Sequence, residues 1–261
     1  MFELTVARRH ILANQKGTLL NLLAVAIAVG VIIMSLALNE GSKANIVTSI
    51  MQKNPHILVQ PKEGEDYIHL HRTLSATILK YPGVLAVSPW LMGAGEASHE
   101  ENITAATFIG IDPDGEEAVM KVQKWMIYGH ISRMKFSGSS AILAQGLVES
   151  LDLKPNENFY LTYGNRSEKF RVAGIIELGT GDQWIYIGLK AAQDLVGEGD
   201  VVSQIGARVA DIYDAPAIAS DLNMKTEYNA KSWQDLSRDL TAFVELQSTI
   251  NLIFYLLMFV I

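Results

Sequence analysis

The 261-residue sequence contains no cysteine. This absence excludes disulfide bonds, catalysis by a thiol, zinc sites built from thiolates and a lipid-modified N-terminal cysteine. An excess of basic residues is also missing, because 21 Lys and Arg stand against 28 Asp and Glu and the formal net charge is −7. General nucleic-acid-binding proteins present a basic surface, so we expect no nucleic acid among the partners.

Motifs for nucleotide, metal and hydrolytic chemistry are absent as well. No stretch matches the phosphate-binding pattern G-x-x-x-x-G-K-[ST], and neither H-E-x-x-H nor G-x-S-x-G occurs. His69 and His71 would project from one face of a strand, but no third ligand lies at a useful spacing. The acidic run that begins at Asp112 lacks the twelve-residue ligand spacing of a calcium loop. We therefore predict no catalytic residue, no cofactor and no metal site, and we do not expect an enzyme.

What the sequence does contain is a long apolar run, LLNLLAVAIAVGVIIMSLAL, at residues 19–38. As a helix its 20 residues would extend for about 30 Å, which matches the hydrocarbon core of a bilayer. A signal peptide is the alternative, because Ser35-Leu36-Ala37 has the small-x-small pattern of a cleavage site. The run is nevertheless longer than the usual apolar region of a signal peptide, about 7–15 residues. We predict a transmembrane helix, consistent with the positive mean hydropathy of the chain, +0.18.

The residues before this run indicate its orientation. Residues 1–18 carry three basic residues against one acidic residue, and this bias places the N-terminus in the cytoplasm. We expect this segment to be an amphipathic helix along the inner membrane interface, with a frayed leader as the alternative. Within the apolar run, Ala26 and Gly30 have the small-xxx-small spacing that allows membrane helices to approach each other closely.

Two amphipathic patterns flank the central region, at residues 39–54 and 232–249. Each pattern repeats apolar residues at helical spacing, the first directly after the apolar run 19–38 and the second directly before the apolar last twelve residues. Ser232 is suited to cap the second helix. We predict two stalk helices that couple the membrane helices to the central region. The residues expected on their contact faces are Ile46, Ile50, Leu240, Phe243 and Val244.

The last twelve residues, 250–261, read INLIFYLLMFVI. They are too few to cross a bilayer, and a buried strand or helix would be one explanation. Because nothing polar ends the run, we predict the start of a second transmembrane helix that the sequence cuts short.

The central region, residues 55–231, alternates strand and helix patterns and predicts an α+β domain. We expect two subdomains, one from 55–111 with 200–229 and the other from 112–199. Asp112-Pro113-Asp114-Gly115 is interpreted as a turn. The expected strands are 56–60, 84–89, 103–111, 140–144, 159–163, 168–177, 184–188, 203–210 and 226–228. The expected helices are 73–81, 145–151, 189–197 and 215–222.

The four tryptophans, Trp90, Trp125, Trp184 and Trp233, lie far apart in the sequence. Large aromatic side chains usually belong to cores. We therefore expect each in the core or in a stalk, and not in a shared ligand cage.

Several stretches together resemble one known family. The N-terminal segment 6–41 is similar to the opening of FtsX-like and MacB-like permeases of ABC transporters. Landmarks in the central region are most similar to the lipoprotein-releasing (LolC/LolE-type) branch, and they occur in that family's order. They are YPGVLAVSPWL (81–91), FIGIDPDG (108–115), AILAQGLVESLDLKPNENFYL (141–161), KFRVAGIIELGTGDQWIYIGLKAAQDLVG (169–197) and IGARVADIYDAPAIASDL (205–222).

This resemblance implies a MacB-like periplasmic core domain inserted between the first and second of four membrane helices. The implied protein is a permease subunit in the cytoplasmic (inner) membrane, with its main domain outside the cytoplasm. Its implied partners are a cytoplasmic ABC ATPase subunit, a second permease copy of the same or a related chain, and membrane lipid. ATP hydrolysis by the ATPase would drive a lipophilic or lipoprotein-like cargo through motion of the stalks. The alternative is a non-transporting FtsX-like scaffold that signals to an extracytoplasmic partner.

Overall fold

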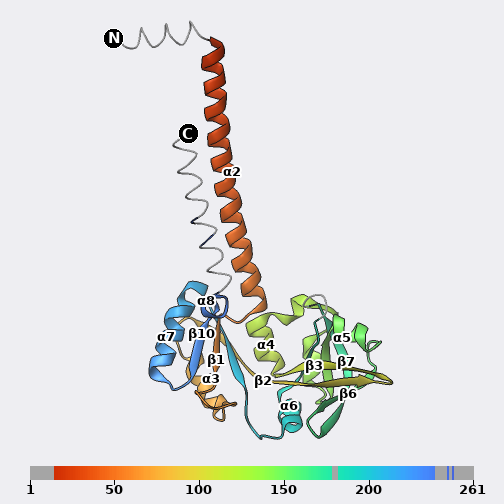
Figure 1. The fold of residues 1–261 in the computed structure, drawn as a ribbon. Helices are drawn as coiled ribbons and strands as arrows, with labels where there is room; N and C mark the ends of the chain where they lie inside the picture. The colour runs from red at the N-terminus through yellow and green to blue at the C-terminus, as the bar shows by residue number, and fades with distance from the viewer. Residues whose placement is uncertain (1–14, 178–181, 239–245, 247–248, 250–261) are drawn as a thin grey trace. The chain divides into compact units, whose positions relative to one another are not determined.

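The computed structural model of the chain describes residues 15–177, 182–238, 246 and 249 (Figure 1). The chain divides into two units, Met1–Ile50 with Ser237–Ile261, and Met51–Leu236, which are described separately. Residues 1–14 of the expected interface helix, the stalk residues Leu240, Phe243 and Val244, and the apolar run 250–261 lie outside the described residues.

Helix α2, Gln15–Lys53, is a single helix of 39 residues. Its segment Gln15–Ala37 is long and apolar enough to cross a membrane, and none of that segment is buried inside the structure. Ala26 and Gly30 lie one turn apart on it and are exposed. Because leucine, valine and isoleucine side chains are exposed all along this segment, its surface suits a lipid environment better than water.

The unit Met51–Leu236 is built on a ten-stranded sheet in the order β10-β1-β9-β2-β3-β8-β5-β7-β4, with β6 paired to β2 and β7. Most neighbours are antiparallel, while β3–β8 and β5–β7 are parallel. The strands are β1 (Ile57–Gln60), β2 (Val84–His99), β3 (Asn102–Ile111), β4 (Met126–Gly129), β5 (Ser140–Ala144), β6 (Asn158–Tyr163), β7 (Arg166–Ile176), β8 (Trp184–Gly188), β9 (Gln204–Val209) and β10 (Asn229–Ser232).

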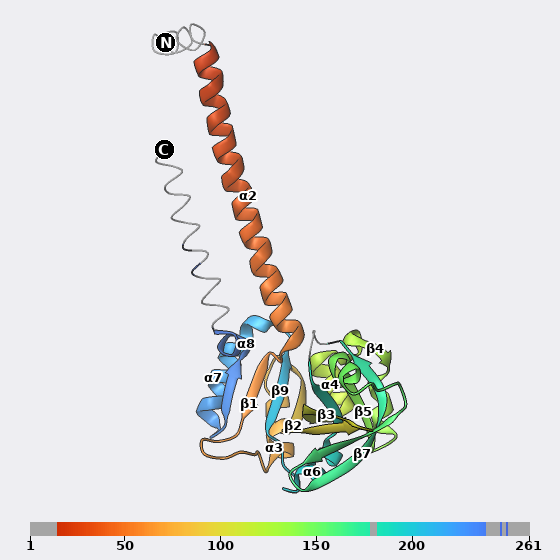
Figure 2. The ribbon, with the colours of Figure 1, turned by 45° about the vertical axis from the view of Figure 1, so that its right-hand side comes forward.

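Strand β2 joins the two ends of this sheet. Its first half, from Val84 to Trp90, pairs with β9, and its second half, from Leu91 to His99, pairs with β3. Figures 1 and 2 show β1, β9 and β10 gathered at one end of β2, and β5, β6 and β7 at the other. The long strand therefore holds both groups of strands in one unit.

The prediction that the strand stops at residue 89 is wrong. Gly93 and Gly95 lie beyond that point, and both continue the ladder with β3. A Cβ atom at Gly93 would lie 2.4 Å from the ring of Phe108 on the neighbouring strand. Glycine here makes room for a buried aromatic ring instead of breaking the strand.

Six helices accompany the sheet in the described part of the unit. They are α3 (His71–Leu79), α4 (Pro113–Met120), α5 (Gln145–Ser150), α6 (Leu189–Val196), α7 (Ala215–Lys225) and α8 (Trp233–Leu236). Short 3-10 segments are η1 (Val122–Trp125), η2 (Ile131–Lys135) and η3 (Ile212–Asp214). The expected helices at 73–81, 145–151, 189–197 and 215–222 are confirmed within one to three residues at most ends.

Two sequence interpretations need correction. Asp112–Gly115 is not a turn but the start of α4, because the Asp112 carboxylate accepts a hydrogen bond from the Gly115 amide at 2.9 Å and Pro113 takes the first helical position. The strand expected at 226–228 lies instead at Asn229–Ser232 as β10, and β4 was not predicted.

The expected cap at Ser232 is confirmed. Its hydroxyl oxygen accepts a hydrogen bond from the Asp235 amide at 3.3 Å, and the Asp235 carboxylate accepts one from the Ser232 amide at 3.0 Å. This reciprocal pairing satisfies the first backbone donors of α8.

Two apolar clusters that belong to the core lie on opposite faces of the sheet. Neighbouring residues of one strand point to opposite faces, so Phe108 belongs to the first cluster and Ile109 to the second. Phe108 is fully buried, and its ring meets Tyr163 edge-on with centroids 5.5 Å apart. The second cluster lies beside the cavity described below.

Because its sheet and core lie within the unit, we expect a fragment spanning residues 54–236 to fold on its own. Replacing Phe108 with alanine in this fragment should lower the free energy of unfolding by about 3–5 kcal/mol, since it removes a buried ring and leaves a cavity. Urea denaturation followed by far-UV circular dichroism measures the change. The matched control is Phe136→Ala, at a ring that is 86% exposed, with an expected change within about 0.5 kcal/mol. Equal costs at both positions would contradict the assigned core.

Candidate functional site

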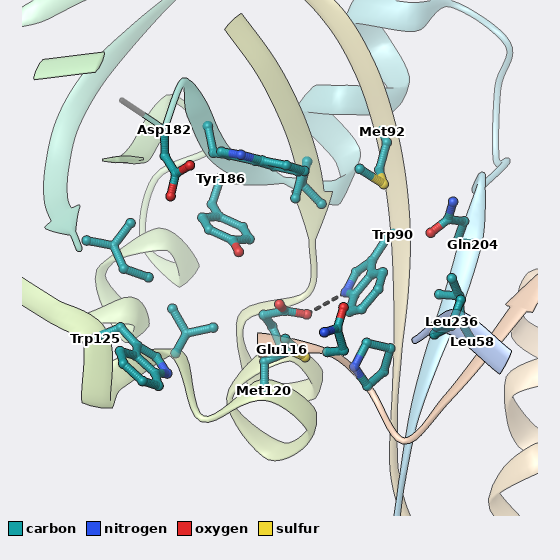
Figure 3. A pocket seen from close by; sticks show the side chains of 16 residues that line it. Leu58, Trp90, Met92, Glu116, Met120, Trp125, Asp182, Tyr186, Gln204 and Leu236 are labelled. Atoms are coloured by element: carbon teal, nitrogen blue, oxygen red, sulfur yellow. Dashed lines mark hydrogen bonds between the residues drawn. The ribbon is translucent and has the colours of Figure 1, made fainter. Parts of the chain in front are cut away.

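A cavity of about 500 Å³ lies within the unit Met51–Leu236 (Figure 3). Strands β2, β3, β8 and β9, helix α4 and the segment η1 all contribute to its wall. Asn54, Pro55 and Leu236 also line it, so the cavity lies where the chain enters and leaves this unit.

Aromatic and sulfur-containing side chains dominate the wall. The aromatic ones are Trp90, Trp125, Trp184 and Tyr186, and the thioethers are Met92 and Met120. Trp90 lies in the second core cluster and Trp125 and Trp184 pack against it, as expected, but the sequence did not predict that all three would line one cavity. The fourth, Trp233, is buried elsewhere and donates a hydrogen bond from its Nε1 to the Ile212 carbonyl at 2.9 Å.

Glu116 is the buried polar group of this site, with a side chain only 1% exposed. The Ser88 hydroxyl donates to its Oε2 at 2.8 Å, and the Trp90 indole N–H donates to the same oxygen. Its other oxygen, Oε1, accepts no hydrogen bond from the residues that the structure describes. One carboxylate oxygen is thus held by strand β2, and the described part of the chain offers the other no hydrogen-bond donor.

The capped start of helix α4 explains why this carboxyl group is buried. With Asp112 as the cap, Glu116 falls at the end of the first turn and on the same side as the buried Val119. The sequence signal that could have revealed this burial is the helical spacing that places the Glu116 carboxylate on the same face as the apolar Val119.

Burial raises the pKa of Glu116 to about 7, and the charge of Glu117 acts in the same direction. The bonds from Ser88 and Trp90 oppose this shift by stabilising the carboxylate. Tyr186 responds likewise: burial, followed by the charges of Glu116 and Asp182, raises the pKa of its hydroxyl group. The Tyr186 hydroxyl therefore stays protonated, and Figure 3 shows it directed toward Glu116.

Trp90 owes its position to a glycine on the neighbouring strand. A Cβ atom at Gly206 of β9 would lie 2.8 Å from the six-membered ring of this indole. Glycine therefore allows the indole to lie against the β9 backbone, where its N–H reaches Glu116.

The polar groups of the cavity are few. Among the described residues that line it there is no lysine, arginine, histidine, serine or threonine. In the parts of the chain that the structure describes, no three His, Asp or Glu side chains gather closely enough to hold a metal ion. His71, considered above as a metal ligand, instead lies 3.0 Å from a carboxylate oxygen of Asp200.

The residues predicted as functional from the sequence lie elsewhere. Ala26 and Gly30 belong to the apolar part of α2, and a Cβ atom at Gly30 would have no neighbour within 4 Å. Ile46 and Ile50 belong to the same helix, but their side chains are not described. The roles of these residues, and of Leu240, Phe243 and Val244 outside the described ranges, stay predictions.

Comparison with known proteins bears on the identity of the fold. A family model described as the MacB-like periplasmic core domain matches residues 18–224. The macrolide export ATP-binding/permease protein MacB of Rhodospirillum rubrum is 28% identical over 226 residues, which cover 80% of this chain and 34% of that protein. The chain thus spans about a third of that relative's length.

Two solved structures share the fold. The periplasmic region of MacB from Actinobacillus actinomycetemcomitans aligns with a TM-score of 0.54 and 11% identity, over 74% of this chain and 95% of that one. The extracellular domain of the noncanonic ABC-type transporter YknZ from Gram-positive bacteria aligns with a TM-score of 0.51 and 16% identity, over 69% and 99%. The expected α+β fold of the MacB-like periplasmic type is confirmed.

The buried carboxyl group predicts an unusual pH dependence of stability. Between pH 4.5 and about 7, folded Glu116 keeps a proton that the unfolded chain releases, so the free energy of unfolding should fall as the pH rises. The loss contributed by this group is up to about 3 kcal/mol and is complete above about pH 7.

Urea denaturation of the 54–236 fragment at a series of pH values tests this. Glu116→Gln keeps the shape but not the titrating group, so its stability should decline less across this window. Glu101→Gln, at an exposed carboxyl group, should behave like the unaltered fragment. Identical pH profiles for the fragment and Glu116→Gln would refute the assignment.

Proposed function

The chain belongs to the family of MacB-like periplasmic core domains, and from this membership we propose that it is the permease component of an ABC transport system. The observation that carries the proposal is the combination, in one chain, of this domain with a membrane-type helix. Membrane anchoring through α2, with the core domain outside the cytoplasm, follows from the same combination.

The chain itself carries no catalytic activity in this proposal. Its sequence lacks the phosphate-binding loop that ATP hydrolysis requires, whereas the relative from Rhodospirillum rubrum is named as an ATP-binding and permease protein. We therefore assign ATP hydrolysis to a cytoplasmic ABC ATPase subunit. A second permease copy completes the proposed assembly, with Ala26 and Gly30 as the place of close helix approach in lipid.

Mechanical coupling through the stalks is the proposed mechanism. Helix α2 runs from Gln15 to Lys53 as one element, from the membrane-type segment to the residue before Asn54. A continuous helix can carry a displacement because bending it disturbs hydrogen bonds and packing, whereas a flexible linker absorbs it. Ile46 and Ile50 on this stalk, with Leu240, Phe243 and Val244 on the other, are the proposed contacts.

The proposed cargo is lipophilic or lipoprotein-like. The resemblance of several sequence landmarks to the lipoprotein-releasing branch supports this class, and so does an aromatic cavity in the core domain. ATP hydrolysis by the assembled complex without movement of any apolar cargo would instead favour the non-transporting FtsX-like scaffold.

The absence of cysteine allows a direct test of topology. Single cysteines at Phe136→Cys in the core domain and at Thr5→Cys near the N-terminus should react differently with a membrane-impermeant maleimide. We expect labelling of the first in intact spheroplasts and of the second only after lysis, because the basic N-terminal segment stays in the cytoplasm. The cysteine-free parent controls for background, and the reverse pattern would contradict the proposed orientation.

Breaking helix α2 within the stalk should uncouple ATP hydrolysis from cargo movement. Ala44→Pro, placed in the full-length protein with its ATPase, removes a helix hydrogen bond and costs about 3 kcal/mol or more locally. We expect assembly and ATP hydrolysis to persist while cargo movement in proteoliposomes falls to background. Ala44→Ser keeps the helix and is the matched control. Full cargo movement with Ala44→Pro would show that the stalk transmits nothing.

A further inference from the structure

The charged side chains among the described residues that line the cavity are both acidic. They are the carboxyl groups of Glu116 and Asp182. The nearest helix adds Glu117, while two bases of neighbouring elements are engaged elsewhere, and Lys121 and Lys124 at the end of α4 and in η1 are not among the lining residues. Arg208 of β9 donates to the Val119 carbonyl at 2.9 Å, and Lys135 of η2 pairs with Asp114 at the exposed start of α4.

We propose that this cavity binds a small apolar amine, whose ammonium group donates to the free Oε1 of Glu116 and whose hydrocarbon body lies between the tryptophan indoles. This inference goes beyond the transport proposal, because it concerns equilibrium binding by the chain without an ATPase.

The geometry of Glu116 supports a donor ligand. Ser88 and Trp90 both bond to Oε2 and hold the carboxyl group in place, so Oε1 faces the cavity with its orientation already set. A buried carboxylate with an unpaired oxygen is costly, and a charge-assisted hydrogen bond from a ligand would remove that cost. Figure 3 shows this carboxyl group at the centre of the site, beside the hydroxyl end of Tyr186.

The walls select a cation over a neutral or anionic ligand of the same shape. Indole faces attract ammonium groups, and three indoles line this space. Thioether side chains such as Met92 adapt to different apolar shapes. An anion would meet Glu116 and Asp182 at low dielectric, with no basic partner in the lining.

The size of the cavity limits the ligand to a small molecule. Ligand pockets usually enclose about 300–1,000 Å³, and about 500 Å³ admits a compact organic molecule but not a folded protein. The occupant is therefore distinct from a lipoprotein-sized cargo.

Three rigid probes of one shape test the proposal: 1-adamantanamine, 1-adamantanol and 1-adamantanecarboxylate. Each is titrated at pH 8 into the 261-residue chain in phosphatidylcholine nanodiscs, with indole fluorescence as the readout and empty nanodiscs as the blank. At this pH a primary alkylamine is protonated, and burial raises the pKa of Glu116 only to about 7. We expect the amine to bind at least about tenfold more tightly than the alcohol, and the carboxylate to bind most weakly.

Substitutions in and near the cavity test whether Glu116 causes the preference for the amine. Glu116→Gln should make the amine and the alcohol bind alike, while Glu117→Gln, at a neighbouring carboxyl group outside the lining, should keep the preference for the amine. Met92→Trp fills the space and should weaken all three probes, with cooperative unfolding as the check that the chain is folded. The proposal is overturned if no probe binds at millimolar concentration, if the alcohol or the carboxylate equals the amine, or if the preference survives Glu116→Gln.

Discussion

The hydrogen-bond ladder of strand β2 is the constraint on which the core domain depends. One strand of 16 residues pairs with β9 through its first half and with β3 through its second half. The two groups of strands therefore cannot separate without breaking a continuous ladder. The cavity lies at the same place, since Trp90 and Met92 stand on either side of the change of partner. A strand that ended at Pro89 would leave these side chains without a common wall.

The buried carboxyl group is the second feature that shapes this region. Donors from β2 bond to only one oxygen of Glu116, so the negative charge of the carboxylate is only partly stabilised by hydrogen bonds. Such half-satisfied groups are rare in cores because they destabilise the folded state. Its position among indole and thioether side chains is the basis of both the proposed ligand site and the expected pH dependence of stability.

Family and fold together limit the function that this chain can perform alone. The core domain belongs to the MacB-like periplasmic type, and the membrane-type helix α2 is continuous with the residues that lead into it. Neither part contains machinery for ATP hydrolysis. In the proposed assembly such a chain binds cargo and transmits motion, and ATP hydrolysis is assigned to a partner subunit.

Several helices of this protein and one helix cap could be predicted from the sequence alone, because they depend on short-range signals. The apolar run at 19–38, the helices at 73–81 and 189–197 and the cap at Ser232 each depend on residues within a few positions of one another, so they can be predicted without the fold. Asp112-Pro113 suits both a turn and a helix start, so these residues alone do not decide between them; in the structure the Asp112 carboxylate caps α4, which carries the buried Val119. The length of β2 also escaped prediction, because the space at Gly93 is filled by Phe108 from another strand. Trp90, Trp125 and Trp184 meet around Glu116 only after β2, η1 and β8 are brought together, and contacts between segments so distant in the chain leave no local pattern to read.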